Sequence, residues 1–501
     1  MILTGAVAVF ADEIGAWSIG DAEAGNPFAS PLDAPLRKMA EDVAVEYRDD
    51  VDVYYNSAGH IVAFFHTHAT NQVGQLDDKG VMFEFDPTTT KMVSRREGFG
   101  SELYGADPAG ALDSFLVDLH VRLHLPDPWG LYLTGILGLM MTAAAVSGFL
   151  IHRHLIKDLF VAPRPSNLVL FARDRHVLAG SWTLPFAFVL AFTGSFLSFA
   201  VSLGLPVVGA TAFGGNQMAL FETLYGLPDY EDSGTAPLVD LDSVTARSTE
   251  IAGSLPTGLA IHHWARADAV VQLYHPPAAG TLRGVKHSFE GKTGRFLGSK
   301  PDIGTAPSIG DTAFGLMFAL HFGDFAGTAS KVIWFSLGLA MCFLTVTGLQ
   351  LWLRRYEDQP LWRRFGRALT ILVYGLPIAM TGAGYAYFLS LSTNETLFWT
   401  PIGFLVVAGL AIAIGLAVRR DLALNRAYRL MLGAGLIALP LLRMLSGGPA
   451  WPELLAMGNT AVVSFDLLLI IAGTGFVIAG TGLTKSHRRA RYASKTLSEE
   501  P

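Results

Sequence analysis

The sequence is poor in cysteine and in charge. Its 501 residues include one cysteine, Cys342, which lies inside an apolar run. A single cysteine excludes an intramolecular disulfide and a cysteine-ligated iron–sulfur cluster within one chain. Charged residues make up 16% of the chain, whereas about a quarter is usual in soluble domains. Much of this chain is therefore expected to lie in lipid.

Several common binding and catalytic motifs are also missing. The sequence has no Walker loop, no G-x-G-x-x-G after a strand, no H-E-x-x-H and no nucleophile elbow. Nothing therefore indicates that this chain itself binds NAD(P)H or flavin. The formal net charge of −7 is mild and gives no sign of nucleic-acid binding.

Long uncharged runs dominate what is present. A helix needs roughly 20 apolar residues to cross the hydrocarbon core. Such runs occur at 131–151, 177–204, 332–353, 368–394 and 396–418, and two later ones, near 430–448 and 454–484, are interrupted by Arg443 and Asp466. With a partial first helix, these runs predict an α-helical integral membrane protein of about eight transmembrane helices.

Basic loops indicate the orientation of these helices. Arginine and lysine gather at 152–176, 354–367 and 419–429 and again in the tail from Lys485 to Lys495. By the positive-inside rule these segments and the C-terminus face the cytoplasm. The long polar segments at about 12–128 and 206–330 then lie on the outer face.

The first 356 residues contain an internal repeat. The matching pairs of segments are 4–11 with 193–200, 80–93 with 284–297, 124–130 with 321–327, and 144–154 with 345–355. Each half is therefore predicted to contain a helix, an outer domain, a histidine motif and a second helix. His176 precedes Thr193 by seventeen residues, and its counterpart would precede Met1. This comparison predicts a start placed too late, with a genuine short form as the alternative.

Both outer segments are predicted to be small α+β modules. In the first, residues 35–49 have helical periodicity, and 51–57, 60–68 and 80–86 are typical of strands. The second has a helix at 243–253 and strands at 259–265 and 269–275. Turns are predicted at 86–91 and 290–295.

The motifs of the two halves resemble those of the PepSY-associated transmembrane proteins. These motifs are the paired T-G-x-x-x-x-F helices, the D-P-x-T-x turn, LHFGDFAG and VTGLQLWLRR, and the resemblance covers about residues 1–356. Some members of that family are iron-regulated ferric-siderophore reductases of the bacterial inner membrane, in which histidines near helix ends hold two b-type haems. The resemblance therefore implies electron transfer across the membrane to ferric-siderophore iron.

Three features depart from the family pattern. The first helix lacks its cytoplasmic half and the histidine expected there. The first half closes with Ser147-Gly148 and IHRH, and residues 357–501 add four predicted helices beyond the usual core. The sequence has no C-x-x-C-H motif, so any haem would be non-covalent. We expect two b-type haems, or one if the first helix is truncated.

The resemblance and the hydropathy together predict a domain organisation. Its parts are a partial transmembrane helix at 1–18, a periplasmic PepSY-like module at 19–118, transmembrane helices at 119–156 and 176–205, a second periplasmic module at 206–318, a transmembrane helix at 319–356, a C-terminal block of four transmembrane helices at 366–485, and a basic cytoplasmic tail at 486–501.

Five histidines are candidate haem ligands. The repeat places His124 and His321 at equivalent outer positions, which favours them as a bis-imidazole pair; hydrogen bonding to headgroups or nearby aspartates is the alternative. His120, one helical turn before His124, is a second candidate ligand or a partner for a haem propionate. His176 occupies the family's inner position, and His152 is its candidate partner.

Other ionisable residues leave alternatives open. His66 and His68 are expected to point to the same side of a strand, where they would bind iron or copper or be ordinary half-exposed residues. His262 and His263 are adjacent and are not expected to chelate one ion together. Arg443 and Asp466 would pair with each other, mark a small-molecule or proton path, or lie near the interface.

The resemblance, together with the placement of the histidines, thus implies a haem protein of the inner membrane, with a ferric siderophore as the expected substrate. Its electron donor would be membrane quinol or a cytoplasmic reductase. Two other classes stay open, a transporter with Asp466 as coupling residue and a PepSY-type membrane protein that binds or regulates a protease.

Overall fold

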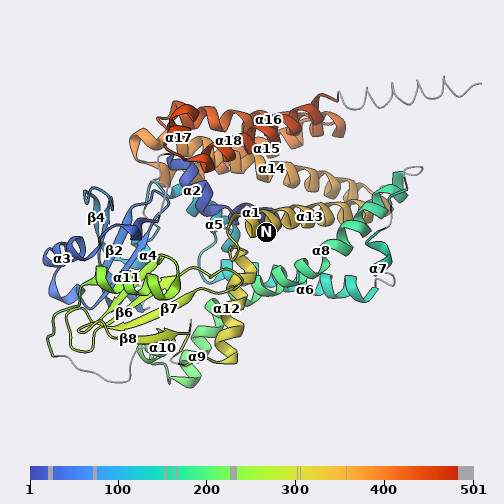
Figure 1. The fold of residues 1–501 in the computed structure, drawn as a ribbon. Helices are drawn as coiled ribbons and strands as arrows, with labels where there is room; N and C mark the ends of the chain where they lie inside the picture. Colours follow the sequence, from blue (N-terminus) through green and yellow to red (C-terminus); the bar gives the residue numbers. More distant parts are fainter. Residues whose placement is uncertain are drawn as a thin grey trace, which may run out of the picture.

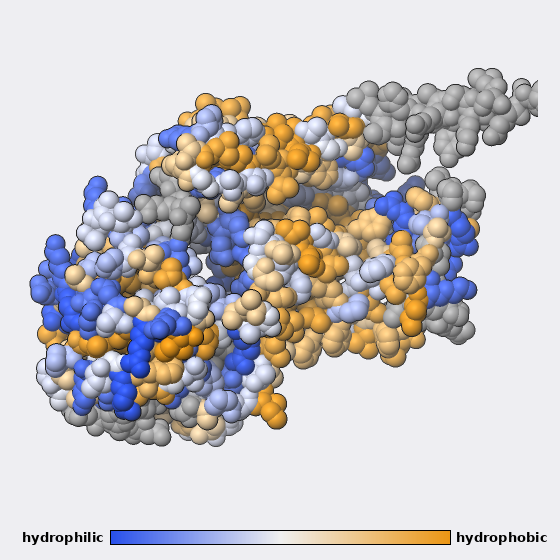
Figure 2. Space-filling view, in the orientation of Figure 1, coloured by the Kyte–Doolittle hydropathy of each residue, from blue (hydrophilic) through white to orange (hydrophobic). Residues whose placement is uncertain are grey.

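A computed structural model describes residues 1–20, 26–71, 76–105, 107–151, 155–160, 162–164, 168–225, 234–301, 303–304, 306–356 and 358–482. The structure consists of a bundle of long helices and one β-sheet that lies beyond one end of that bundle (Figure 1). Hydrophobic residues cover much of the visible surface of the helices, and hydrophilic residues cover more of the sheet region (Figure 2).

The described residues contain seven helices that are long and apolar enough to cross a bilayer. They are α6 (Trp129–Ile151), α8 (Leu168–Phe199), α13 (Thr328–Leu353), α14 (Pro360–Ser390), α15 (Thr396–Ala417), α16 (Asp421–Leu445) and α18 (Thr460–Thr481). At the N-terminus, α1 (Ile2–Ala8) and α2 (Ala11–Ile19) meet at 59° and make an eighth span if they are counted as one. The prediction of a multi-pass membrane protein is confirmed.

Two transmembrane helices begin later than their predicted boundaries of 119 and 319. The shorter helices α5 (Ala111–Val121) and α12 (Ile309–Phe322) precede α6 and α13 as separate elements. Leu123 and His124 have φ angles of 54° and 53°, a left-handed backbone that stops α5. Gly323, with φ of 68°, caps α12 in the same way.

The two predicted outer modules share a single sheet. Its strands are β1 (Asp50–Tyr55), β2 (Ile61–Thr70), β3 (Leu76–Phe85), β4 (Met92–Phe99), β5 (Gly258–His262), β6 (Val270–His275), β7 (Val285–Glu290) and β8 (Phe296–Lys300). The order is β4-β3-β2-β1-β5-β6-β7-β8, and every neighbouring pair is antiparallel. The two four-stranded meanders therefore join edge to edge through β1 and β5, an arrangement the sequence did not predict.

Helices cover one face of this sheet. The helices α3 (Asp33–Glu41) and α11 (Leu241–Ala252) pack on side chains such as Val51, Phe65 and Ile261 to form the main hydrophobic core. The helix predicted at 35–49 ends at Glu41, because residues 45–47 form a 3-10 turn before β1 begins. The remaining short helices are α4 (Gly100–Leu103), α7 (Leu155–Asp158), α9 (Leu205–Ala212), α10 (Gln217–Tyr225) and α17 (Trp451–Ala456).

The opposite face of the sheet, which we call the inner face, carries polar side chains. Alternate residues of a strand point to opposite sides, so Asp52, Tyr54 and His66 lie on this face. A cavity beside it is lined by residues of β1 and β3 and also by Asp12 of α2 and Asp113 of α5. In the first half of the sheet, the inner face is therefore directed toward the helices.

A buried ion pair connects the C-terminal helices to α2. Arg443 and Asp466 are 1% and 0% exposed, and Arg443 Nη2 donates to Asp466 Oδ2 over 2.9 Å. The indole nitrogens of Trp17 and Trp451 donate to the same carboxylate over 2.7 and 2.8 Å. Of the alternatives that the sequence left open for Arg443 and Asp466, the structure shows that they pair.

We expect Asp466→Asn to destabilise the protein by about 3–5 kcal/mol, because it leaves a buried guanidinium without its counter-charge. Thermal unfolding of the detergent-solubilised protein measures this effect. Glu453→Gln is the control, since Glu453 lies on an exposed position of α17. Equal unfolding temperatures for the two variants would show that the ion pair contributes nothing to stability.

Candidate functional site

Three histidines contact Thr-Gly pairs on neighbouring helices. His321 Nδ1 lies 3.1 Å from the hydroxyl of Thr193. The next residue, Gly194, faces the same ring, and a Cβ at this position would lie 2.9 Å from His321 Cε1. Only glycine therefore lets the imidazole edge approach α8 this closely.

The same contact recurs at two other places. His120 Nδ1 lies 3.2 Å from the hydroxyl of Thr4 on α1, and His176 Nδ1 lies 3.0 Å from that of Thr347 on α13. The glycines that follow these threonines, Gly5 and Gly348, face the imidazole Cε1 atoms, and a Cβ would lie 2.8 and 3.0 Å away. From the sequence, these Thr-Gly pairs served to align the repeat and to support the family resemblance. Their recurrence was the signal that they receive histidines.

The threonine hydroxyls determine which ring nitrogen carries the proton. The hydroxyls of Thr4, Thr193 and Thr347 each donate to a carbonyl oxygen within 2.8 Å on their own helix. Because its proton is used, each hydroxyl accepts from the imidazole, so Nδ1 is the protonated nitrogen. Each Nε2 is left with a lone pair, which is the form of histidine that binds a metal.

His120 and His321 lie next to each other. Their ring centroids are 6.2 Å apart, and their planes differ by 17°. A metal–imidazole bond is about 2.0 Å long, and a ring centroid lies roughly 1.1 Å behind its nitrogen, so two imidazoles on opposite sides of one metal would have centroids about 6.2 Å apart. The observed separation of the two centroids equals this distance.

The third histidine lies at the other end of the bundle. His176 and Thr193, the partner of His321, are seventeen residues apart on the same helix, α8. At 1.5 Å per residue this spacing corresponds to about 26 Å, close to the ~30 Å thickness of a hydrocarbon core. The two imidazole sites are therefore separated by nearly the width of a membrane.

The expected pairing of His124 with His321 is not what the structure shows. His124 follows the left-handed turn that ends α5, and its ring stacks on Phe115 with centroids 4.3 Å apart. Its Nε2 lies 3.0 Å from the carbonyl oxygen of Phe115. The reversal at Leu123 and His124 directs this ring back to its own helix, and His120 takes the place beside His321.

The inner candidate His152 lies outside the described residues, as does His154. The pair Ser147-Gly148 occupies the fourth Thr-Gly position of the repeat. Within the described part of the chain, no atom comes within 4 Å of a Cβ placed on Gly148. Unlike the three Thr-Gly pairs, Ser147-Gly148 therefore receives no histidine from the described residues.

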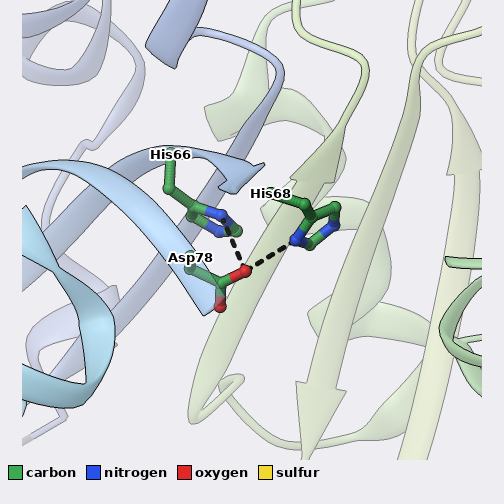
Figure 3. Close-up of side chains that lie close together, drawn as sticks. All are labelled: His66, His68 and Asp78. Carbon is green, nitrogen blue, oxygen red and sulfur yellow. Dashed lines mark hydrogen bonds and ion pairs between the residues drawn. The ribbon is translucent and has the colours of Figure 1, made fainter. Parts of the chain in front are cut away.

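A cluster of histidines and carboxylates lies on the inner face of the sheet. His68 Nδ1 is 2.7 Å from Asp78 Oδ1, and His66 Nδ1 is 3.5 Å from the same oxygen (Figure 3). Hydrogen bonds to Asp50 and Asp78 raise the pKa of His68 to about 10. Burial lowers the pKa of His66, but Asp52 and its neighbours raise it more. His66 and His68 point to the same side, as the sequence predicted, and each is paired with carboxylates.

The imidazole rings of His262 and His263 do not converge on one site, as expected. The backbone of His263 is left-handed, with φ of 57°, and its Nδ1 lies 3.4 Å from Asp268. His262 remains on the inner face, with its Nδ1 3.3 Å from Asp50. The two adjacent rings thus contact different carboxylates.

Comparison with known proteins identifies the family. The model of the PepSY-associated TM region matches residues 1–355, which include all three Thr-Gly pairs and their histidines. The chain belongs to the PepSY-associated TM region family. The resemblance of the motifs is thereby confirmed, and helices α14 to α18 lie beyond the matched region.

The chain is also similar to a curated protein. An uncharacterized protein of Pseudomonas aeruginosa is 28% identical over 266 residues, which cover 50% of this PepSY-associated chain and 65% of the relative. The chain thus spans slightly less than two thirds of that relative's length.

We expect Gly194→Ala to destabilise the protein by about 1–3 kcal/mol, because the added methyl group displaces the ring of His321. Thermal unfolding in detergent measures the change. Gly148→Ala is the matched control and should shift stability by at most about 1 kcal/mol, since the new methyl group meets open space. A Gly194→Ala protein as stable as the control would contradict the tight contact.

Proposed function

We propose that this protein is a b-type haem protein of the bacterial inner membrane that transfers electrons to ferric-siderophore iron on the outer face. The observation that carries the proposal is the pair His120 and His321. Their ring centroids are 6.2 Å apart, and a threonine fixes the tautomer of each ring. Such bis-imidazole coordination is one of the ways in which proteins hold haem.

The chain's own residues would hold haem at two levels. His120 and His321 would bind iron at the outer end of the bundle, and His176 would contribute one ligand at the inner end. Haem supplies a one-electron carrier when it is bound. The threonines accept from Nδ1 and so leave Nε2 available as the ligand atom, and the glycines let the imidazoles approach without displacing them. Two such levels would divide the membrane crossing into shorter electron transfers.

The basic loops support the direction of insertion. The inner level lies near arginines that follow α13, including Arg354 and Arg355. Positive residues of this kind favour the cytoplasmic side, which would put the sheet in the periplasm and the C-terminus in the cytoplasm. Electrons would then enter from membrane quinol or a cytoplasmic reductase at the level of His176.

A cavity of about 380 Å³ beside the inner face supports an outer substrate site. Asp12, Glu84, Asp107 and Asp113 line it, together with one arginine, Arg96. Burial raises the pKa of Asp113 to about 7 and also raises that of Asp107. Even with Asp113 partly protonated near neutral pH, carboxylates outnumber the single arginine in this lining. The lining therefore favours a cationic or neutral ferric chelate over an anionic one.

The cavity lies close to the outer histidine pair. Asp113 and His120 are both on α5, seven residues apart, which corresponds to about 10 Å along the helix. A chelate in the cavity would be within a short distance of an iron held by His120 and His321. Its Fe(III) would take up one electron and leave as Fe(II).

The transporter alternative receives less support. Asp466 was the candidate coupling residue, but Arg443, Trp17 and Trp451 all donate to its carboxylate. A fully buried carboxylate that accepts from three donors is suited to stabilising the packing of the helices. It is not suited to the repeated binding and release of a proton or an ion.

Haem content tests the proposed ligands directly. We expect the purified protein to show a b-type reduced-minus-oxidised spectrum, and His321→Ala to remove the haem at the outer end because one axial ligand is lost. His124→Ala is the control and should keep its full haem content, since that ring is turned onto Phe115. A protein without haem, or loss of haem in the control alone, would overturn the assignment.

Electron delivery is tested by mixing pre-reduced protein with a ferric siderophore under anaerobic conditions. We expect the reduced-haem absorbance to decay while a ferrous-specific chelator traps one Fe(II) for each electron released. The gallium(III) form of the same siderophore is the matched control, because gallium(III) does not accept the electron. Equal persistence of the reduced spectrum with both metals would contradict the reductase function.

A further inference from the structure

The cluster on the inner face has a convergent geometry. The Nδ1 atoms of His66 and His68 both point at one oxygen, Asp78 Oδ1, over 3.5 and 2.7 Å (Figure 3). One ligand atom from each of these three residues lies within 4.8 Å of the other two. Small rotations of the side chains would let all three bind one ion at the usual bond length of about 2.0–2.2 Å.

Each imidazole also contacts a second carboxylate through its other ring nitrogen, Nε2. His66 Nε2 lies 3.2 Å from Asp52, and His68 Nε2 lies 3.3 Å from Asp50. Histidines that bind metals through one nitrogen usually donate the other N–H to a carboxylate or carbonyl group, which orients the ring. Here both rings have a carboxylate on the far nitrogen while their near nitrogens converge.

The strand pattern explains how the sequence builds this arrangement. His66 and His68 are two apart on β2 and therefore share a face. Asp78 lies directly opposite His68 on β3, and Asp50 lies opposite His66 on β1. The ligands and the carboxylates behind them thus stand on three adjacent, hydrogen-bonded strands, which hold them more rigidly than a loop would.

Charge provides a second argument for a bound cation. Three carboxylates, those of Asp50, Asp52 and Asp78, surround His66 and His68, and Asp50 also contacts His262. Asp50 and His66 are only 8% and 3% exposed. A different buried pair in this sheet, His275 and His287, shares the hydroxyl of Ser248 instead, over 2.7 and 2.9 Å. Two histidines can thus be buried in this sheet without carboxylates, and the carboxylates around His66 and His68 would neutralise a divalent ion that displaces the imidazole protons.

We propose that His66, His68 and Asp78 form a binding site for a first-row divalent transition-metal ion, with Asp52 and Asp50 orienting the two imidazoles. Two imidazoles and one carboxylate suit Fe²⁺ or Zn²⁺ and leave coordination positions open for water or another ligand. This site is separate from the haem-binding histidines and does not depend on the proposed function. If that function holds, Fe²⁺ is released beside the same face of the sheet. Fe²⁺ is a first-row divalent transition-metal ion, the class of ion that this site is proposed to bind.

Equilibrium dialysis of the full-length, chelator-treated protein against micromolar Zn²⁺, followed by metal analysis, tests the site. We expect the unaltered protein to bind one zinc ion per chain. The His68→Gln and Asp78→Asn variants should not bind this ion, because each substitution removes a ligand. Asp52→Asn should weaken binding by about 10–100-fold, since it removes only the group that orients His66. Circular dichroism and gel filtration verify that each variant is folded.

Two control variants make the result specific. His60→Gln removes a different histidine–carboxylate pair of the same half of the sheet, His60 with Glu84, and should keep the zinc ion. His321→Ala should also keep it, so loss of haem and loss of zinc are distinguished. No zinc bound to the unaltered protein, or full zinc binding by folded His68→Gln and Asp78→Asn, would overturn the proposal.

Discussion

The contact of an imidazole edge with a glycine fixes how the core helices of this protein meet. At Gly5, Gly194 and Gly348 a single methyl group would collide with a histidine ring. The neighbouring threonine has already used its hydroxyl proton within its own helix, so it holds the ring in one tautomer and one orientation. Helix spacing, ring orientation and the tautomer of the imidazole thus follow from one dipeptide. This dependence explains why the three sites resemble one another although they join different helices.

Much of the membrane part could be predicted from the sequence, because spans depend on local composition. Each uncharged run overlaps one of the seven long helices, and the predicted positions of His176 and His321 at helix ends made both of them candidate ligands. His124 was favoured over His120 because both His124 and His321 begin an H-x-x-D-x-x-G motif. The left-handed residues Leu123 and His124 reverse the chain there, and that reversal was not evident from the motif.

Long-range pairing was harder to predict. Strands β1 and β5 are about 200 residues apart in the chain, and their hydrogen bonds are made by backbone atoms. No side-chain pattern indicates such a partner. The partnership of Arg443 with Asp466 likewise depends on how α16 and α18 cross, and Trp17 from the opposite end of the chain completes it. The sequence indicated that the charges of Arg443 and Asp466 needed partners, but it did not identify those partners.

The pairing of β1 with β5 has a consequence for the side chains that each half of the sheet can carry. Because backbone groups make this junction, its geometry is largely independent of those side chains. One half carries carboxylates around His66 and His68, whereas the other has a hydroxyl between His275 and His287. The continuous sheet thus keeps the two halves aligned although their polar groups differ.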